Sequence, residues 1–191
     1  MFEIIACPEA ELSDDLLRQT LDALRAEWPG AFTVASAEQV ELNDPALHAM
    51  IFSLLLDGKL AGHVSVPRKT IEHRGEPYKA YALSGVLTVP AFRGKGYGEQ
   101  VVRAATAFME EDGADIGLFT CDPPLRAFYE RSGWTLLEGA SLVGGPRAKP
   151  FPSDTLGKIT FARFFSARAQ ARRNAFVGAA IRLELREGDL W

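Results

Sequence analysis

Apolar positions change period along the chain, from strand-like runs to helical spacing, and these changes predict its elements. Phe2–Ala6 is a short apolar run that predicts a first strand. The leucines of 16–24 then recur on one helical face, with Ser13 at the N-cap position and Pro29-Gly30 at the end. Residues 31–47 are ambiguous, either a loop or a loop with one short helix.

Two apolar runs then flank an Asp-Gly pair, which is a strong hairpin signal. His48–Leu56 and Lys59–Pro67 are the two arms, and Asp57-Gly58 is the turn. A polar connection is expected around Glu72–Pro77, and Tyr78–Val89 is expected to be one long strand that is interrupted at Ser84-Gly85. The glycine inside that strand predicts a bulge or a close approach of another backbone.

The rest of the chain alternates helices and strands. In chain order we expect a helix ending near Asp112, a strand Ile116–Cys121, a short helix Leu125–Arg131, a strand Trp134–Leu137, a long loop Gly139–Gly157, and closing strands Ile159–Phe165 and Ala179–Leu185. The arginines of Ser166–Gly178 have helical spacing and are expected on a solvated helix face. This order predicts an α/β or α+β sheet with helices packed on it, in a single domain spanning residues 1–191.

Composition narrows the classes of function. Hydrophobic residues make up 47% of the 191 residues and the net charge is −4, so we expect a substantial core and neither nucleic acid nor membrane as partner. Cys7 and Cys121 do not indicate a disulfide framework or a zinc site, and we expect them to be reduced. The sequence lacks the pattern of a signal peptide and any apolar stretch near the roughly 20 residues of a membrane span, so a cytoplasmic protein is expected.

One stretch carries a recognisable chemical signal, the segment VLTVPAFRGKGYGEQVVRAA. A predicted strand ends there, glycines stand at Gly94, Gly96 and Gly98, and an amphipathic helix begins. Backbone N–H groups and the helix dipole bind phosphate at such a place, and glycine lets a pyrophosphate approach the backbone. The spacing fits neither a P-loop nor a Rossmann fingerprint. A glycine-rich turn without a ligand is the alternative for the bare pattern.

Two signatures in order resemble the GNAT superfamily of N-acetyltransferases, over about residues 48–137. Arg93-Gly94-Lys95-Gly96-Tyr97-Gly98 resembles the acetyl-CoA pyrophosphate loop of that superfamily. Leu125-Arg126-Ala127-Phe128-Tyr129-Glu130-Arg131-Ser132-Gly133-Trp134 resembles its second signature, a tyrosine-bearing helix that ends at Gly-aromatic. The resemblance implies one GNAT-type domain with a mixed, mostly antiparallel sheet, splayed in the middle, and helices on both faces.

A looser resemblance, over about residues 45–191, is to the aminoglycoside 2′-N-acetyltransferases. It rests on scattered residues, namely His48-Ala49, Lys59-Leu60-Ala61-Gly62-His63, Arg74-Gly75 and Leu185-Arg186-Glu187-Gly188-Asp189-Leu190-Trp191.

These resemblances imply that an acetyl group passes directly from acetyl-CoA to a primary amine of a small molecule, with an aminoglycoside among the candidate acceptors. The implied cofactor-binding residues are the backbone of Leu87, Thr88 and Val89, the loop residues Arg93, Gly94, Lys95, Gly96, Tyr97 and Gly98, and also Asp122 and Arg126. Asp122 stands where the family commonly has asparagine. The three histidines, His48, His63 and His73, lack ligand spacing, so no metal site is expected, and it stays open whether His63 faces the active-site cleft.

Tyr129 matches the family's tyrosine that protonates the departing thiolate, a role that suits a phenol with a pKa of about 10. The alternative is a tyrosine packed in the core. The general base is not identified. The aminoglycoside group carries a glutamate on the strand before the loop, where this chain has Ser84, and residues 78–89 contain no carboxylate. Serine is no general base without a partner, so either the base lies elsewhere, with Asp122, Asp189 and the Trp191 carboxylate as candidates, or a water chain carries the proton to bulk solvent.

The aminoglycoside group places its terminal Asp-x-Trp against the acceptor. We therefore expect Trp191 to dock near the acceptor, so that Asp189 and the Trp191 carboxylate supply negative charge to the amine. The alternative is that Trp191 only covers a sheet edge. Basic residues dominate 139–158, which favours an acceptor with few positive charges or with a carboxylate. A GNAT fold that senses acyl-CoA without turnover is the alternative function, and a homodimer is left open.

Overall fold

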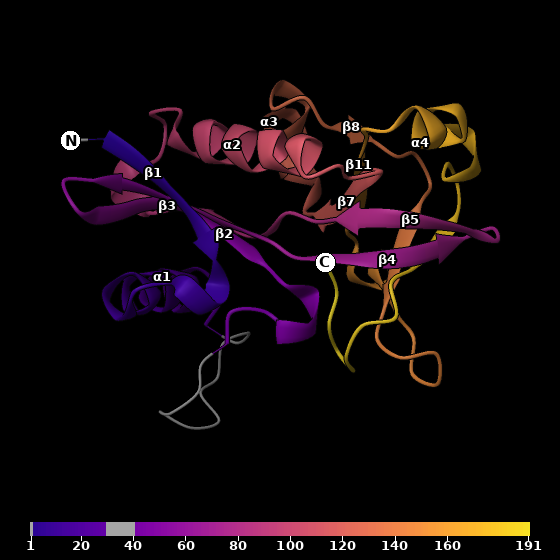
Figure 1. Cartoon of the computed structure of the whole chain (residues 1–191), viewed down its shortest axis with the longest axis horizontal. Helices are drawn as coiled ribbons and strands as arrows, with labels where there is room; N and C mark the ends of the chain where they lie inside the picture. Colours follow the sequence, from indigo (N-terminus) through magenta and orange to yellow (C-terminus); the bar gives the residue numbers. More distant parts are fainter. Residues whose placement is uncertain (1, 30–40) are drawn as a thin grey trace. The chain divides into compact units, whose positions relative to one another are not determined.

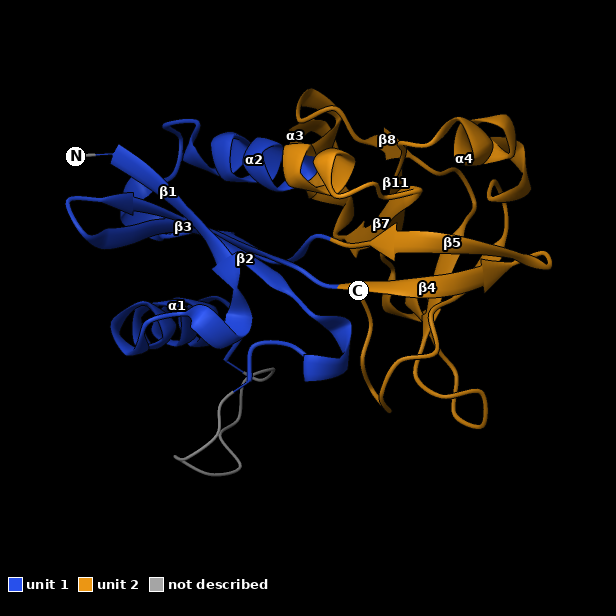
Figure 2. Cartoon of the chain, viewed as in Figure 1, with its two compact units in different colours: residues 1–67, 83–106 blue, residues 68–82, 107–191 orange. Residues whose placement is uncertain are grey.

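The computed structural model describes residues 2–29 and 41–191. The chain forms two compact units, residues 1–67 with 83–106 and residues 68–82 with 107–191, which Figure 2 shows in separate colours. The part of the ambiguous region 31–47 that precedes residue 41 lies outside the described residues.

Unit 1 is built on one antiparallel sheet, in the order β1-β2-β3-β6 (Figure 1). Its elements in chain order are β1 (Phe2–Pro8), η1 (Glu9–Glu11), α1 (Asp14–Glu27), η2 (Pro45–Leu47), β2 (Met50–Leu56), β3 (Lys59–Val66), β6 (Ser84–Thr88), η3 (Pro90–Phe92) and the first part of α2 (Tyr97–Glu111).

Helix α1 begins where its sequence pattern predicts. The Ser13 Oγ accepts a hydrogen bond from the Leu16 N–H at 3.3 Å and so caps the first turn. Leu16 then packs in a buried cluster with Leu55 and Leu60, on the facing strands β2 and β3. The helix therefore owes its place to a stripe of apolar side chains that the sheet covers.

Helices cover both faces of the unit 1 sheet. A Cβ added at Gly85 of β6 would lie 3.3 Å from Leu24 of α1, and 3.8 Å from the His63 ring. A Cβ added at Gly62, the neighbour of His63 in β3, would lie 3.7 Å from Val101 of α2. Because neighbouring residues of a strand face opposite ways, α1 and α2 lie on opposite faces.

The hairpin predicted at Asp57-Gly58 is confirmed. These two residues join β2 to β3 and both have positive φ, 49° and 76°. Positive φ at both central residues is the geometry of a two-residue type I′ turn, which favours Asp-Gly.

The single strand expected over Tyr78–Val89 is wrong. β5 (Glu76–Tyr81) pairs with β4 and β7 in one sheet, whereas β6 pairs with β3 in another. Ala82 and Leu83, between the two strands, are buried and apolar like their neighbours, so the hydrophobic pattern carries no sign of the change of sheet.

The polar connection expected around Glu72–Pro77 is also wrong. It is the tip of a hairpin between β4 (Arg68–His73) and β5, and its turn is Arg74 (φ 51°) and Gly75 (φ 78°). Polar side chains on an edge strand resemble a loop in the sequence, because only every second residue of such a strand is buried.

Unit 2 contains a five-stranded sheet in the order β4-β5-β7-β11-β8 and a three-stranded sheet in the order β10-β9-β12. Besides β4, β5 and the end of α2, its elements are β7 (Ile116–Cys121), η4 (Pro123–Leu125), α3 (Arg126–Arg131), β8 (Thr135–Leu136), β9 (Ser141–Gly144), β10 (Phe151–Pro152), η5 (Ser153–Leu156), β11 (Ile159–Phe164), α4 (Ala167–Ala171), η6 (Arg173–Ala175) and β12 (Ala180–Arg182). β5 and β7 are parallel, and the other pairs of the larger sheet are antiparallel.

The smaller sheet corrects two expectations. The segment expected to be a long loop, Gly139–Gly157, contains β9 and β10. The closing strand expected over Ala179–Leu185 is only β12, and it pairs in parallel with β9 rather than joining the larger sheet. Strands of two to four residues are too short to show a period in the sequence.

An aromatic cluster forms the core of unit 2. Phe119 of β7 lies 4.5 Å from Tyr129, 4.8 Å from Trp134 and 5.7 Å from Phe161, measured between ring centroids. A Cβ on Gly117 would lie only 2.5 Å from the Trp134 ring, so glycine is required there for the indole to pack against β7.

The arginines of Ser166–Gly178 were expected on a solvated helix face, but two of them make ion pairs. Arg168 pairs with Asp115 and its guanidinium lies 5.3 Å from the centre of the Tyr78 ring. Arg172 pairs with Glu76 at 3.1 Å. These contacts attach the short helix α4 to the larger sheet.

The fold class predicted from the sequence is confirmed: an α/β (α+β) fold with mixed, mostly antiparallel sheets and packed helices. Among the described residues, no helix has the length and the apolar character that crossing a membrane requires.

Candidate active site

The predicted site residues fall into two groups, one in each unit. Unit 1 carries Ser84, the segment Leu87–Val89 and the loop Arg93–Gly98, whereas unit 2 carries Asp122, Arg126, Tyr129, Asp189 and Trp191. Each group has its own local geometry, which the sequence could anticipate only in part.

Strand β6 contains the bulge that its glycine predicted. Ser65 of β3 lies opposite Ser84, but His63 lies opposite Leu87, so β6 advances three residues while β3 advances two. The extra residue sits near Gly85, whose φ is +58°, a conformation that glycine adopts readily. The bulge directs Ser84 and Leu87 to the same face of the sheet.

β6 is the edge strand of its sheet, so half of its backbone groups have no strand partner among the described residues. The Val89 N–H donates to the Ala61 carbonyl at 2.9 Å. Alternate residues of a strand direct their N–H groups to opposite edges, so the Thr88 N–H points to the open edge. Of the predicted backbone positions Leu87, Thr88 and Val89, the geometry thus singles out Thr88 as a donor to a bound ligand.

The glycine loop has the shape of an anion cradle. Gly94 (φ +75°) and Gly96 (φ +78°) are left-handed, and a Cβ built on either would meet no protein atom within 4 Å. The first helical bond of α2 runs from the Gln100 N–H to the Gly96 carbonyl at 3.2 Å. The N–H groups of Tyr97 and Gly98 therefore precede the helix ladder and can bind an anion in the open space.

The two cations of the loop differ in their surroundings. The Arg93 Nε donates to the Thr88 carbonyl at 3.0 Å and its Nη2 pairs with Glu27, the last residue of α1. The Lys95 ammonium makes only a long hydrogen bond of 3.4 Å to the Ala91 carbonyl and lies over the Phe92 ring. Lys95 is the freer of the two for a phosphate.

Tyr129, in unit 2, is almost wholly buried at 4% exposure. Burial, and next the Cys121 thiol nearby, raise the pKa of its phenol well above the usual value. Burial likewise raises the pKa of the Cys121 thiol to about 11. Tyr129 is therefore a protonated phenol at any physiological pH, as a proton donor must be, although packing against Phe119 also gives it a structural role.

Asp122 and Arg126 are both engaged in ion pairs. The Asp122 carboxylate accepts from Lys158 Nζ at 2.7 Å, and the Arg126 Nε donates to Glu130 at 2.8 Å. Asp122, which replaces the asparagine usual in the family, is thus held by a lysine from the turn before β11.

Asp189 and Trp191 are separated by one residue in the sequence but differ in exposure. The Trp191 ring is 6% exposed, and its backbone oxygen accepts a hydrogen bond from Thr120 Oγ1 at 2.9 Å. The Asp189 side chain is exposed, and its carbonyl accepts from the Gly145 N–H at 3.1 Å. The C-terminal segment is therefore tied to β7 and to the end of β9.

Charge around the loop 139–158 is more balanced than the sequence suggested. Arg147 pairs with Glu184 and Lys149 pairs with Glu187 at 2.9 Å, in addition to the pair between Lys158 and Asp122. The acids come from sequence positions far from the loop, so a count over one segment could not find them. The argument for an acceptor with few positive charges loses its basis.

The sequence did not settle whether His63 faces the active-site cleft. In the structure this histidine is buried beside Ser84 and Gly85. His63 is 0% exposed, and its Nε2 lies 3.2 Å from the Ser65 Oγ. Burial lowers the pKa of His63 to about 3. The signal in the sequence was the polar alternation of His63 and Ser65 inside an otherwise apolar strand, which the strand pattern alone did not explain.

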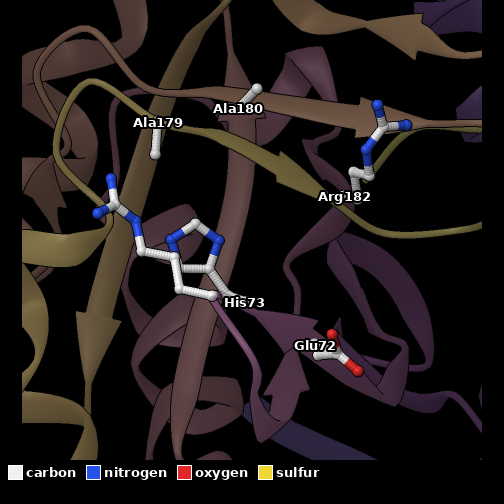
Figure 3. A pocket seen from close by; sticks show the side chains of 6 residues that line it. Glu72, His73, Ala179, Ala180 and Arg182 are labelled. Carbon is white, nitrogen blue, oxygen red and sulfur yellow. The ribbon is translucent and has the colours of Figure 1, made fainter.

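A pocket of about 320 Å³ opens in unit 2, and none of the residues that line it is a predicted site residue (Figure 3). It is lined by Glu72, His73, Arg74, Ala179, Ala180 and Arg182. The His73 Nε2 lies 2.9 Å from the Ala175 carbonyl and its ring stacks on Phe176, so this histidine is structural. In the described part of the chain, no group of three or more His, Cys, Asp or Glu side chains is arranged to hold a metal ion.

Comparison with solved structures shows the same fold in proteins of low sequence identity. An acyl-CoA N-acyltransferase from Pseudomonas aeruginosa is 16% identical, with a TM-score of 0.60 over 85% of this chain and 99% of that chain. An aminoglycoside acetyltransferase from an uncultured soil metagenomic sample is 16% identical, with a TM-score of 0.55 over 69% and 86%. Glucosamine-6-phosphate N-acetyltransferase from Arabidopsis thaliana is 20% identical, with a TM-score of 0.53 over 70% and 90%.

No curated protein matches the sequence. The family model of the acetyltransferase (GNAT) family matches residues 16–134, which is more than half of the chain and includes β6, the glycine loop and Tyr129. The chain therefore belongs to the acetyltransferase (GNAT) family.

Proposed function

We propose that the protein transfers an acetyl group from acetyl-CoA to a primary amine of a small molecule. The observation that carries the proposal is the loop Arg93–Gly98, in which left-handed glycines leave open space before the N–H groups of Tyr97 and Gly98 at the start of α2. A pyrophosphate fits this space, because no Cβ fills it and the helix N-terminus is electropositive. We also propose that both units belong to one acyltransferase domain, residues 1–191.

Acetyl-CoA supplies an activated thioester when it is bound. In this proposal the Thr88 N–H, on the open edge of β6, donates to the pantetheine chain or to the acetyl carbonyl. A donor held rigidly in a strand stabilises a developing oxyanion without reorganisation. Lys95 and the N–H groups of Tyr97 and Gly98 hold the pyrophosphate.

Tyr129 is assigned the role of general acid in the same proposal. Its raised pKa keeps the phenol protonated, so its hydroxyl donates a proton to the sulfur as the thiolate leaves. The C-terminal residues Asp189 and Trp191 are assigned to the side of the acceptor, where the exposed Asp189 carboxylate attracts an ammonium group.

The acceptor class is proposed only as a small primary amine. Solved relatives of this fold include proteins named for an aminoglycoside and for glucosamine 6-phosphate, and their identities of 16% and 20% assign neither acceptor to this chain. The first experiment measures thiol release from acetyl-CoA with a panel of aminoglycosides, amino sugars, polyamines and amino acids.

Thiol release that is faster with an amine than without one supports the acetyltransferase function. Loss of this release in Tyr129→Phe ties the reaction to this site. Saturable acetyl-CoA binding without turnover on any amine supports the second function, an acyl-CoA-sensing module. The absence of a strand carboxylate at Ser84 is the observation that favours this second function.

A further inference from the structure

A row of buried polar side chains crosses the unit 1 sheet beside the bulge of β6. Ser53 of β2 lies opposite His63 of β3, and Ser65 of β3 lies opposite Ser84 of β6. Residues directly opposite in antiparallel strands share a face, with Cβ atoms about 4.5–5.5 Å apart. His63 and Ser65 are two residues apart and share a face as well. We call His63, Ser65 and Ser84 the polar row; Ser53 lies outside it, across His63 from strand β6.

The polar row runs from the interior to the site. Ser53 and His63 are 0% exposed and Ser65 is 3% exposed, whereas Ser84 is half-buried. His63 Nε2 and Ser65 Oγ are 3.2 Å apart, within hydrogen-bond distance. Ser84 is thus the member that a ligand can reach.

The polar row is poorly explained as packing. Among the described residues, the His63 Nδ1, the Ser53 Oγ and the Thr20 Oγ1 are buried without a hydrogen bond. Unpartnered buried polar groups destabilise a fold, and an apolar side chain at position 63 would avoid that loss. In the polar row, His63 and Ser65 are buried despite this loss of stability, and the row ends at the predicted site residue Ser84. These two facts together indicate a role in that site.

We infer that His63 is a positioning residue, which orients the Ser84 hydroxyl through Ser65 so that Ser84 accepts a hydrogen bond from the incoming amine. This inference rests on the proposed function. In this inference the Ser65 O–H donates to His63 Nε2 across the observed 3.2 Å, and the Ser84 O–H donates to Ser65 Oγ, a bond inferred from their facing positions in the two strands. Both lone pairs of Ser84 are then free for the amine N–H. No covalent bond is made or broken in the polar row, and the imidazole gains no proton.

The surroundings of His63 keep the polar row neutral. Its neighbours are Ser53 from β2, Leu87 and Gly85 from β6, and Leu24 from α1, none of which is charged. On α1 the nearest charged residues in sequence to Leu24 are Arg25 and Asp22, which pair with each other at 3.8 Å. Burial alone holds the imidazole neutral, so the direction of the hydrogen bonds does not change with pH in the usual assay range.

Two buried serines on either side of His63 give a matched test. Ser65→Ala breaks the polar row between His63 and Ser84, whereas Ser53→Ala removes a hydroxyl on the far side of His63. With the best amine of the panel, we expect Ser65→Ala to lower kcat by about 10- to 100-fold, as misorientation at a reacting centre does. Ser53→Ala should change kcat less than about twofold, and neither should change the Kd for acetyl-CoA.

The histidine itself is tested by a conservative pair. His63→Gln keeps an acceptor near the Nε2 position and should retain kcat within about threefold, whereas His63→Leu should match Ser65→Ala. Acetyl-CoA binding reports whether each variant is folded, and the serine pair decides the matter if His63→Leu fails to fold. Equal kcat in Ser65→Ala and Ser53→Ala overturns the inference.

The pH profile separates positioning from proton transfer. Between about pH 5.5 and 8, kcat of the wild type and of His63→Gln should follow the same curve, because a neutral His63 does not titrate there. An inflection near pH 6.5 that His63→Gln removes would overturn the positioning role. A wild type that acetylates no amine is a different result, because it overturns the proposed function itself.

Discussion

Arg93, the first residue of the glycine loop, is paired with Glu27, the last residue of α1, at 2.5 Å between Nη2 and Oε2. Both side chains are partly exposed, at 51% and 37%, so the pair is a weak one. The carboxylate competes with any phosphate for the same guanidinium.

Glu27→Gln should therefore tighten acetyl-CoA binding. Loss of the competing charge frees Arg93, and we expect the Kd to fall by about 2- to 5-fold at low salt, with a smaller gain at high salt. Calorimetry measures it, with Asp22→Asn on the same helix as the control. A weaker affinity would show that Glu27 holds Arg93 in its binding position.

Gly96→Asp should abolish much of the acetyl-CoA affinity. The substitution puts a Cβ and an anion into the open space before α2, and we expect the Kd to rise by about 10-fold or more, ~1.4 kcal/mol. Gly58→Asp is the control, because Gly58 has nearly the same φ (+76°), equally open space and a place in a hairpin turn. Similar losses in both variants would mean that backbone strain, rather than a lost phosphate site, is responsible.

Tyr129→Phe should lower kcat by about 10²- to 10⁴-fold and leave the Kd for acetyl-CoA nearly unchanged. The raised pKa of this acid also sets the sign of a pH effect. The acid acts while protonated, so no decline of kcat from Tyr129 is expected below about pH 10. Steady-state kinetics with the active amine checks both statements. Wild-type turnover in the phenylalanine variant would leave Tyr129 as a core residue beside Phe119.

Trp191→Ala tests whether Trp191 contacts the acceptor or only covers a sheet edge. If Trp191 and Asp189 serve the acceptor, kcat/KM for the amine should fall by about 10-fold or more while acetyl-CoA binding persists. Thr120→Val removes the hydrogen bond to the Trp191 backbone and keeps the ring, so it should have a smaller effect. A lower melting temperature with intact kcat/KM would make the ring structural.

His63 should also make the protein sensitive to acid. The folded imidazole has a pKa of about 3, below the usual 6.5, so the unfolded chain binds a proton that the folded chain does not. Stability is then full above about pH 6.5 and falls as the pH drops towards 3, by about 2 kcal/mol between pH 7 and 5. Urea unfolding at both pH values measures the loss, which should be smaller in His63→Gln.

The sequence predicted the elements with strong local signals. The N-cap at Ser13, the Asp57-Gly58 hairpin and the glycines before α2 were all found, because each has a cause within a few residues. The change of sheet between Tyr81 and Ser84 was missed, since both halves are apolar and only their distant partners differ.

The candidate site shows the same division. The glycine loop and Tyr129 follow from contiguous motifs, and the structure has left-handed glycines before α2 and Tyr129 within the short helix α3, while their roles stay predictions. The pairing of Arg93 with Glu27 and the neighbours of His63 depend on contacts between residues far apart in the chain. No spacing rule covers such contacts, so a single sequence could not supply them.

The division of the chain into units has a consequence for its synthesis. All segments of unit 1, including the glycine loop, have been made once Thr106 is added, whereas only residues 68–82 of unit 2 exist at that point. Another 85 residues bring the chain to Trp191, which takes roughly 4–17 s at about 5–20 residues per second. During that time a nascent chain can display the glycine loop before the strands around Tyr129 have all been translated, so any ligand of this loop meets the loop before it can meet Tyr129.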